Sequence, residues 1–316
     1  MKTESFVFGY ELDGHGQGLP ITEPEKSAGD YWLHLDYSHG DIVSVLNFLH
    51  VNGNAQDSLL RIDTRPRTIV TDEYIVLLLR GVNSNPGADP EDMVSLRLYI
   101  DKKRLVSLRQ RQLFSAQDMK RDLESGKGAK NIAELVLGLI EKMADRVESF
   151  VVDLDDKMER LEDAIQQQSV NSRGEITALR RQAVTVKRFI SPQRDALEAL
   201  HRQGNLWFDV NALFQLREQN DRFTRYVEDL ELLRERTQLL QEELMNQLAQ
   251  QQNNRMYLLA IITTIFLPIS FLTGLFGMNV AGLPGTENTN AFLIVGGLML
   301  SISFITVLLL KRNRWF

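Results

Sequence analysis

Two long apolar runs near the C-terminus constrain this chain more than any other feature. One is MYLLAIITTIFLPISFLTGLF (Met256–Phe276) and the other is AFLIVGGLMLSISFITVLLL (Ala291–Leu310), and neither contains a charged residue although 25% of the chain is charged. At about 1.5 Å per residue, each run is about 30 Å long as a helix, which matches the hydrocarbon thickness of a bilayer. We therefore predict two transmembrane helices. The alternative is a pair of buried core helices in a soluble protein.

The cations beside these runs predict their orientation. Arg255 abuts the first run, and the loop Gly277–Asn290 contains Glu287 but no cation. Three cations follow the second run: Lys311, Arg312 and Arg314. The positive-inside rule then places both termini in the cytoplasm and the loop outside. The N-terminal stretch MKTESFVFGYELDG lacks the apolar segment of a signal peptide, so we expect the residues before the first run to stay on the side of synthesis.

Composition excludes several classes of function. A net charge of -6 argues against a nucleic-acid partner, because phosphate binding needs a basic surface. The chain has no Cys, which excludes disulfides, thiolate catalysis and thiolate metal sites. No nucleophile–base pair or phosphate-binding loop stands out, so we expect neither an enzyme nor a bound cofactor. The five His residues lie outside the apolar runs, which argues against a tetrahedral zinc cage within them.

The segment before the first run predicts one long helix. It has neither Pro nor Gly from Asp209 to Arg255. Mostly apolar residues recur every seven positions: Leu216, Phe223, Leu230, Thr237, Leu244 and Gln251. This pattern predicts a stalk helix over 209–276, with 256–276 in the membrane. Such a helix suits either a coiled-coil stalk that only dimerises or a helix that lines a pore.

One face of the first run is unusually polar for a membrane span. Continuing the helical period places a set of residues on that face, with Leu267 beside it: Asn253, Met256, Thr263, Ser270 and Gly277. Small polar residues suit a water-filled pathway, and they suit helix–helix packing equally well. Two helices cannot enclose an aqueous pathway, so conduction would need an oligomer.

The polar part of the chain predicts an α/β domain followed by helices. Residues 1–125 alternate strand-like and turn-like stretches, including two hairpins in RTIVTDEYIVLLLRGV and MVSLRLYIDKKRLVSLRQ. Residues 126–208 are helical in pattern, with one helix from about Lys130 and a second that begins with the capping pair Ser172 and Glu175. The first of these helices carries an acidic run that includes Asp153, Asp155 and Asp156. These carboxylates either attract cations or form a solvated helix face.

The loop after the first run carries a recognisable motif. Gly277-Met278-Asn279 follows the first of two C-terminal spans, which resembles the signature of the CorA superfamily of divalent-cation transporters. Four further stretches resemble the zinc transporter branch of that superfamily, ZntB: DTRPR (Asp63–Arg67), LVSLRQR (Leu105–Arg111), SPQRDAL (Ser191–Leu197) and FLTGLFGMNVAGLPG (Phe271–Gly285). The resemblance covers essentially the whole chain.

This resemblance implies a funnel-shaped homopentamer in a bacterial inner membrane, with contacts to lipid and a pore lined by the first spans. It also implies that oxygens of Asn279 hold a hydrated divalent ion at the outer mouth, where Gly277 allows a tight turn and Met278 packs against it. The segment NVAGLPGTEN lacks the aromatic and acidic run of magnesium-type members and keeps only Glu287 to attract cations, which favours the zinc branch.

We therefore expect transport of Zn²⁺. We expect uptake because a divalent ion gains about 4.6 kcal/mol per 100 mV on entering a negative interior. Proton coupling stays open. One alternative is a Mg²⁺/Co²⁺ channel, and another is a membrane-anchored coiled-coil scaffold.

Overall fold

The computed structural model describes residues 3–23, 29–62, 65–167, 173–278, 283 and 289–312. The chain divides into two compact units, Met1–Gln241 and Glu242–Phe316, and helix α6 (Val210–Phe276) contributes to both. The predicted domain boundaries at residues 125 and 208 fall inside the first unit and stay predictions.

The first unit contains a mixed seven-stranded sheet in the order β2-β1-β3-β7-β6-β5-β4. The strands are β1 (Phe6–Leu12), β2 (Gly18–Ile21), β3 (Tyr31–Asp36), β4 (Arg67–Val70), β5 (Ile75–Gly81), β6 (Val94–Ile100) and β7 (Arg104–Arg109). All neighbouring strands are antiparallel except β3 and β7, which pair in parallel with Tyr31 opposite Arg104. The two predicted hairpins are confirmed as β4–β5 and β6–β7.

Helices cover both faces of this sheet. The short helices α1 (Ile42–Phe48) and α2 (Gly53–Leu60) pack on one face and form a core there with buried side chains such as Leu33, Val76 and Leu108. On the other face lie α3 (Phe114–Glu124) and the start of α4 (Ile132–Gln166), which pack on one another. The unit therefore has α/β architecture, as predicted.

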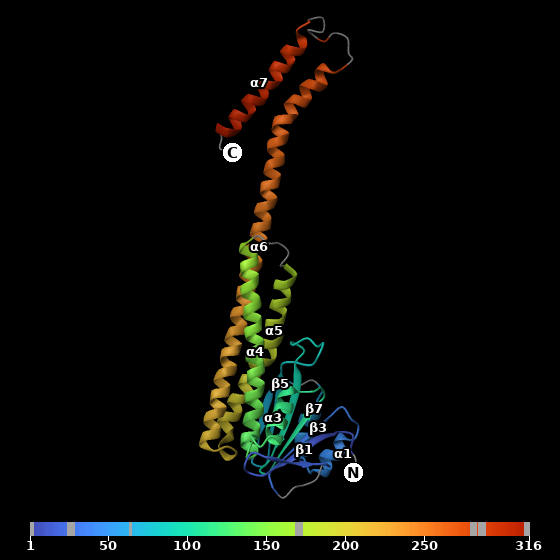
Figure 1. Ribbon diagram of the computed structural model, residues 1–316, viewed down its shortest axis with the longest axis vertical. Coiled ribbons are helices and arrows are strands. Elements are labelled where there is room, and N and C mark those ends of the chain that lie inside the picture. The colour runs from blue at the N-terminus through green and yellow to red at the C-terminus, as the bar shows by residue number, and fades with distance from the viewer. Residues whose placement is uncertain are drawn as a thin grey trace. The chain divides into compact units, whose positions relative to one another are not determined.

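Three long helices extend from the sheet (Figure 1). They are α4, α5 (Arg173–Gln203) and the first part of α6, and α5 also packs along strands β4 and β5. Side-chain caps fix two of the helix starts: Asn131 accepts from the backbone N–H of Glu134 at 2.9 Å, and Asp209 accepts from that of Ala212 at 2.7 Å. The predicted starting residue of α5, Ser172, lies outside the described residues.

The seven-residue pattern of the stalk is buried within a single chain. Leu216, Phe223, Leu230 and Thr237 on α6 are fully covered, and ion pairs on either side of them join α6 to α4 and α5. The repeat therefore forms the buried seam of a helical bundle within one chain, and the burial of these four residues does not require a second copy.

Candidate functional site

The two apolar runs form the helices that could cross a membrane. They are the last part of α6 and helix α7 (Ala291–Arg312), and only 6% of each apolar window is buried in the chain. The alternative of two buried core helices is therefore wrong. Helix α6 continues through Pro268 to Phe276 without interruption. The long stalk helix and the first span are thus one element.

The first span has two different sides. Its more covered positions follow helical spacing: Ile261, Ile265, Pro268, Ile269, Leu272 and Leu275. Ile261 is 7% exposed, and on α7 Leu310 is 8% exposed, so these two are the buried residues of the spans among those described. The five positions predicted to line a pore are all exposed: Asn253, Met256, Thr263, Leu267 and Ser270. At about 100° per residue, Met256, Thr263, Leu267 and Ser270 lie on the side of the helix opposite the covered positions, whereas Asn253 lies between the two sides. The chain leaves the polar side of its first span uncovered.

The end of α6 is built around a glycine. The N–H of Gly277 donates to the carbonyl of Thr273 at 2.9 Å, which closes the last turn. A Cβ on Gly277 would lie 2.7 Å from that same oxygen, so a larger residue would force the turn to shift. Met278 is 46% exposed. Asn279, Glu287 and Arg314 lie outside the described residues, so their predicted roles stay predictions.

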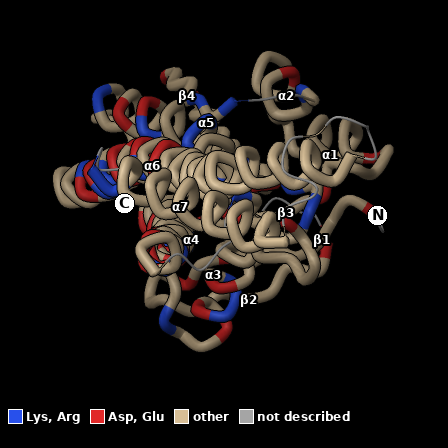
Figure 2. The backbone as a smooth tube through the Cα atoms, turned by 90° about the horizontal axis from the view of Figure 1, so that it is seen from above, with Lys and Arg blue, Asp and Glu red and all other residues tan. Residues whose placement is uncertain are grey.

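The acidic run of α4 is largely engaged in ion pairs. Arg236 on α6 contacts Asp155 at 2.6 Å and Glu162 at 2.7 Å. Asp153 pairs with Lys157 at 2.5 Å on its own helix. Asp156 is exposed and has no ion pair within the described ranges. Of the three carboxylates predicted to attract cations, Asp156 therefore keeps an uncompensated charge in the single chain. Acidic and basic residues are interspersed along α4 and α6 (Figure 2).

A second arginine on α6 makes a similar bridge that sequence reasoning missed. Arg222 contacts Asp145 at 2.7 Å and Glu148 at 2.5 Å on α4, and the hydroxyl of Tyr226 donates to Glu148 at 2.8 Å. Burial raises the pKa of Tyr226 to about 12, and Arg222 holds the pKa of Glu148 below its usual range. Arg222 and Arg236 are four helical turns apart, and this spacing is the signal that could have identified them. They fix the position of α4 along the helix that becomes the first span.

The described residues hold no group of three or more His, Asp or Glu side chains that could bind a metal ion. His34 lies instead in the core of the first unit, with Nδ1 2.7 Å from the hydroxyl of Ser107. Burial lowers the pKa of His34 to about 3, so this side chain is neutral.

A large α/β and helical unit, a stalk helix that continues into an apolar span, and a second apolar span together define a two-span membrane protein. The chain belongs to the CorA family: the model of the CorA-like Mg²⁺ transporter protein family matches residues 27–312. It is thus a CorA-like divalent-cation transporter and not an enzyme.

Individual relatives agree with this assignment. The divalent cation transporter CmaX of Pseudomonas aeruginosa is 36% identical, over 98% of this chain and 96% of its own length. The zinc transport protein ZntB of Yersinia enterocolitica is 31% identical, over 100% of this chain and 97% of its own. The solved structure of full-length CmaX superposes with a TM-score of 0.85 at 35% identity, covering 100% of this chain and 99% of that one. The predicted CorA resemblance and the predicted fold class are confirmed.

Proposed function

We propose that this chain transports Zn²⁺ into the cell through a pore lined by the first spans of several copies. The observation that carries the proposal is the uncovered polar side of α6 at Thr263 and Ser270, opposite the covered side that includes Ile261. Small hydroxyl side chains can stay hydrated next to a water-filled path, whereas on a side that faces lipid they make no favourable contact with the apolar tails.

Zinc is the preferred ion for two reasons. ZntB proteins are among the relatives that match the full chain, and the loop segment NVAGLPGTEN lacks the acidic run of magnesium-type members. Mg²⁺ is the second candidate, because the family model carries that ion in its description. In either case, Asn279 is proposed to hold the ion with its water shell, since neutral oxygens are the ligands that hydrated divalent ions accept.

We propose that the transporter is a homo-oligomer, with five copies implied by the family resemblance. Exposed apolar residues lie along the side of α6 opposite its buried seam: Val210, Phe214, Leu232 and Leu239, which are 83%, 63%, 54% and 65% exposed. Leu232 and Leu239 are one heptad apart on this side, and a neighbouring copy that packs against α6 would cover them. Replacing both Leu232 and Leu239 with Glu should reduce the mass of the detergent-solubilised particle. The same change at exposed Val152 on α4 is the control.

The proposed location is the bacterial inner membrane, with both termini in the cytoplasm, and the proposed direction is uptake. A negative interior favours entry of a divalent ion by about 4.6 kcal/mol per 100 mV. The described spans contain no Asp, Glu, Lys or Arg between Met256 and Phe276 that could couple export to another ion. Proton coupling through groups outside the spans is compatible with uptake, and a pH gradient across the vesicle would reveal it.

Flux measurements with purified protein in proteoliposomes test the proposal. We expect Zn²⁺ uptake that a negative interior accelerates, with weak competition from Mg²⁺. Asn279→Ala should reduce the flux strongly, whereas Asn246→Ala, on the polar part of α6, should leave it unchanged. Preferential Mg²⁺ uptake would replace zinc with the second candidate, and absence of any flux from an intact oligomer would favour a scaffold.

A further inference from the structure

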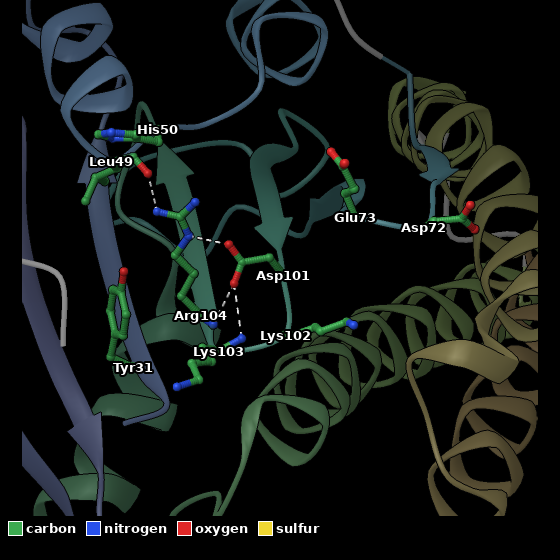
Figure 3. Close-up of a pocket in the computed structure, with 9 residues that line it drawn as sticks. All are labelled: Tyr31, Leu49, His50, Asp72, Glu73, Asp101, Lys102, Lys103 and Arg104. Carbon is green, nitrogen blue, oxygen red and sulfur yellow. Dashed lines mark hydrogen bonds and ion pairs between the residues drawn. The ribbon is translucent and has the colours of Figure 1, made fainter. Parts of the chain in front are cut away.

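A hollow of about 500 Å³ lies at one end of the sheet, beside the β4–β5 and β6–β7 turns (Figure 3). The side chains at its floor are already engaged. Tyr31 and Leu49 are 3% and 0% exposed, and Figure 3 shows Arg104 bonded to Asp101 and to the carbonyl of Leu49. A ligand in this hollow would therefore meet mainly exposed turn charges, whereas the first span presents hydroxyl groups with a fixed polarity.

Two adjacent threonines lie about a third of the way along the first span. The hydroxyl of Thr263 donates to the carbonyl of Leu259 at 2.8 Å, and the hydroxyl of Thr264 donates to the carbonyl of Ala260 at 2.8 Å. A hydroxyl group has a single proton, so each oxygen keeps only its lone pairs for a further partner. Both threonines therefore act as hydrogen-bond acceptors toward their surroundings.

The two threonines differ in the side of the helix that they occupy. Thr263 shares the uncovered side with Met256, Leu267 and Ser270, whereas Thr264 lies about 100° further round the helix. A bond from the hydroxyl to the preceding turn also satisfies a threonine that faces lipid, so the bond alone does not identify a pathway. What distinguishes Thr263 is its position on the uncovered side.

On that side, Thr263 interrupts an apolar stretch. The side chains that share the side between Met256 and Leu267 are those of Leu259, Ala260, Thr263 and Phe266, of which Thr263 alone is polar. Leu259 and Leu267, one turn before and one turn after Thr263, are 64% and 65% exposed. The stretch is about 16 Å long. An ion that passes it loses contact with bulk water, so a polar group there acts where stabilisation is most needed.

An acceptor at this point suits a hydrated cation. Water molecules bind a cation through their oxygens and direct their hydrogens outward, so a wall that holds the water shell has to offer acceptors. The Thr263 oxygen offers them, because its own proton is used within the helix. The hydroxyl proton of Ser270 has no such partner within the described residues, so Ser270 can either donate or accept.

We propose that Thr263 is a specificity-determining residue for the transported ion. This proposal rests on the proposed function, in which the first spans of several copies line a pore. The Thr263 oxygens of those copies form a ring of acceptors, and the ring receives hydrogen bonds from the water shell of the divalent cation. Because the ring contacts water and not the metal, it serves Zn²⁺ and Mg²⁺ alike.

Valine substitutions test the proposal, because valine replaces the hydroxyl with a methyl group of similar size. Thr263→Val and Thr264→Val remove the same bond to the preceding turn at the same depth, so a general effect on the helix should appear in both. We expect Zn²⁺ uptake into proteoliposomes to fall at least about tenfold in Thr263→Val and to stay within about twofold of wild type in Thr264→Val, since only the first loses an acceptor from each copy. Thr263→Ser keeps the hydroxyl and should stay within about threefold of wild type.

The outcomes separate this role from the proposed function. Equal uptake by the two valine variants, or full uptake by Thr263→Val, would overturn the role of Thr263. If a thiol reagent still blocks uptake through a Ser270→Cys protein in that case, the pore itself stands. If the wild-type protein shows no uptake of Zn²⁺ or Mg²⁺, the proposed function fails, and the role of Thr263 fails with it.

Discussion

Protonation of His34 offers a quantitative test of the packing between the sheet and its helices. The side chain is fully buried on β3, its ring stacks on Phe8 with centroids 4.6 Å apart, and its Nε2 has no hydrogen-bond partner. Burial, with a smaller effect from Arg109, lowers its pKa from 6.5 to about 3. The folded protein therefore excludes a proton that the unfolded chain binds below pH 6.5.

The sign and size of the effect follow from this difference. Because the folded pKa is the lower one, the contribution of His34 to stability is complete above pH 6.5 and is lost as the pH falls toward 3. At pH 5, about 1.5 below the pKa of the unfolded side chain, protonation of the unfolded chain lowers the free energy of unfolding by about 2 kcal/mol relative to neutral pH.

The assay is denaturant unfolding of the full-length protein in detergent at about pH 7.5 and about pH 5, followed by tryptophan fluorescence. Trp32 is a suitable reporter, because its Nε1 donates to the same Ser107 hydroxyl that contacts His34, at 2.7 Å. Replacing His34 with Gln keeps a polar group but removes the titration. The wild-type protein should lose about 2 kcal/mol more than the variant between the two pH values. An identical loss in both proteins would refute the reasoning.

Three further substitutions probe other parts of the structure. Gln193→Leu removes the acceptor 2.6 Å from the backbone N–H of Arg80, and denaturant unfolding should show a loss of about 1–3 kcal/mol. Gly277→Ala should reduce ion flux far more than Gly274→Ala, because a Cβ at Gly274 meets no atom within 4 Å; equal flux in the two variants would contradict the close contact at the helix end. Arg236→Gln should cost only about 1 kcal/mol or less, measured as the unfolding midpoint at low and high salt, since its ion pairs are partly exposed.

Much of this architecture could be predicted because strong local patterns carry it. The apolar runs, the long helix without Pro or Gly, and the hairpins around TDE and DKK are all confirmed at nearly the predicted bounds. The edge strand β2 was missed because Pro20 interrupts its pattern, which an edge strand tolerates. Helices α2 and α3 were missed because their sequences, GNAQDSLL and FSAQDMKRDLE, are short and largely polar.

Long-range pairing was beyond the reach of sequence patterns. The parallel contact between β3 and β7 joins segments about 70 residues apart, and no periodicity encodes it. The bridges of Arg222 and Arg236 to α4 likewise depend on which helices become neighbours. Conversely, the polar side of the first span could be predicted, because helical period alone decides which residues share a face.

Thiol modification within the first span tests the central claim most directly. In this chain without cysteine, single Cys residues replace Ser270 on the uncovered side and Leu272 on the covered side, and Zn²⁺ flux into proteoliposomes is measured before and after a membrane-impermeant thiol reagent. The account predicts that the reagent blocks flux through the Ser270→Cys protein and leaves the Leu272→Cys protein active. Block of the Leu272→Cys protein alone would contradict it.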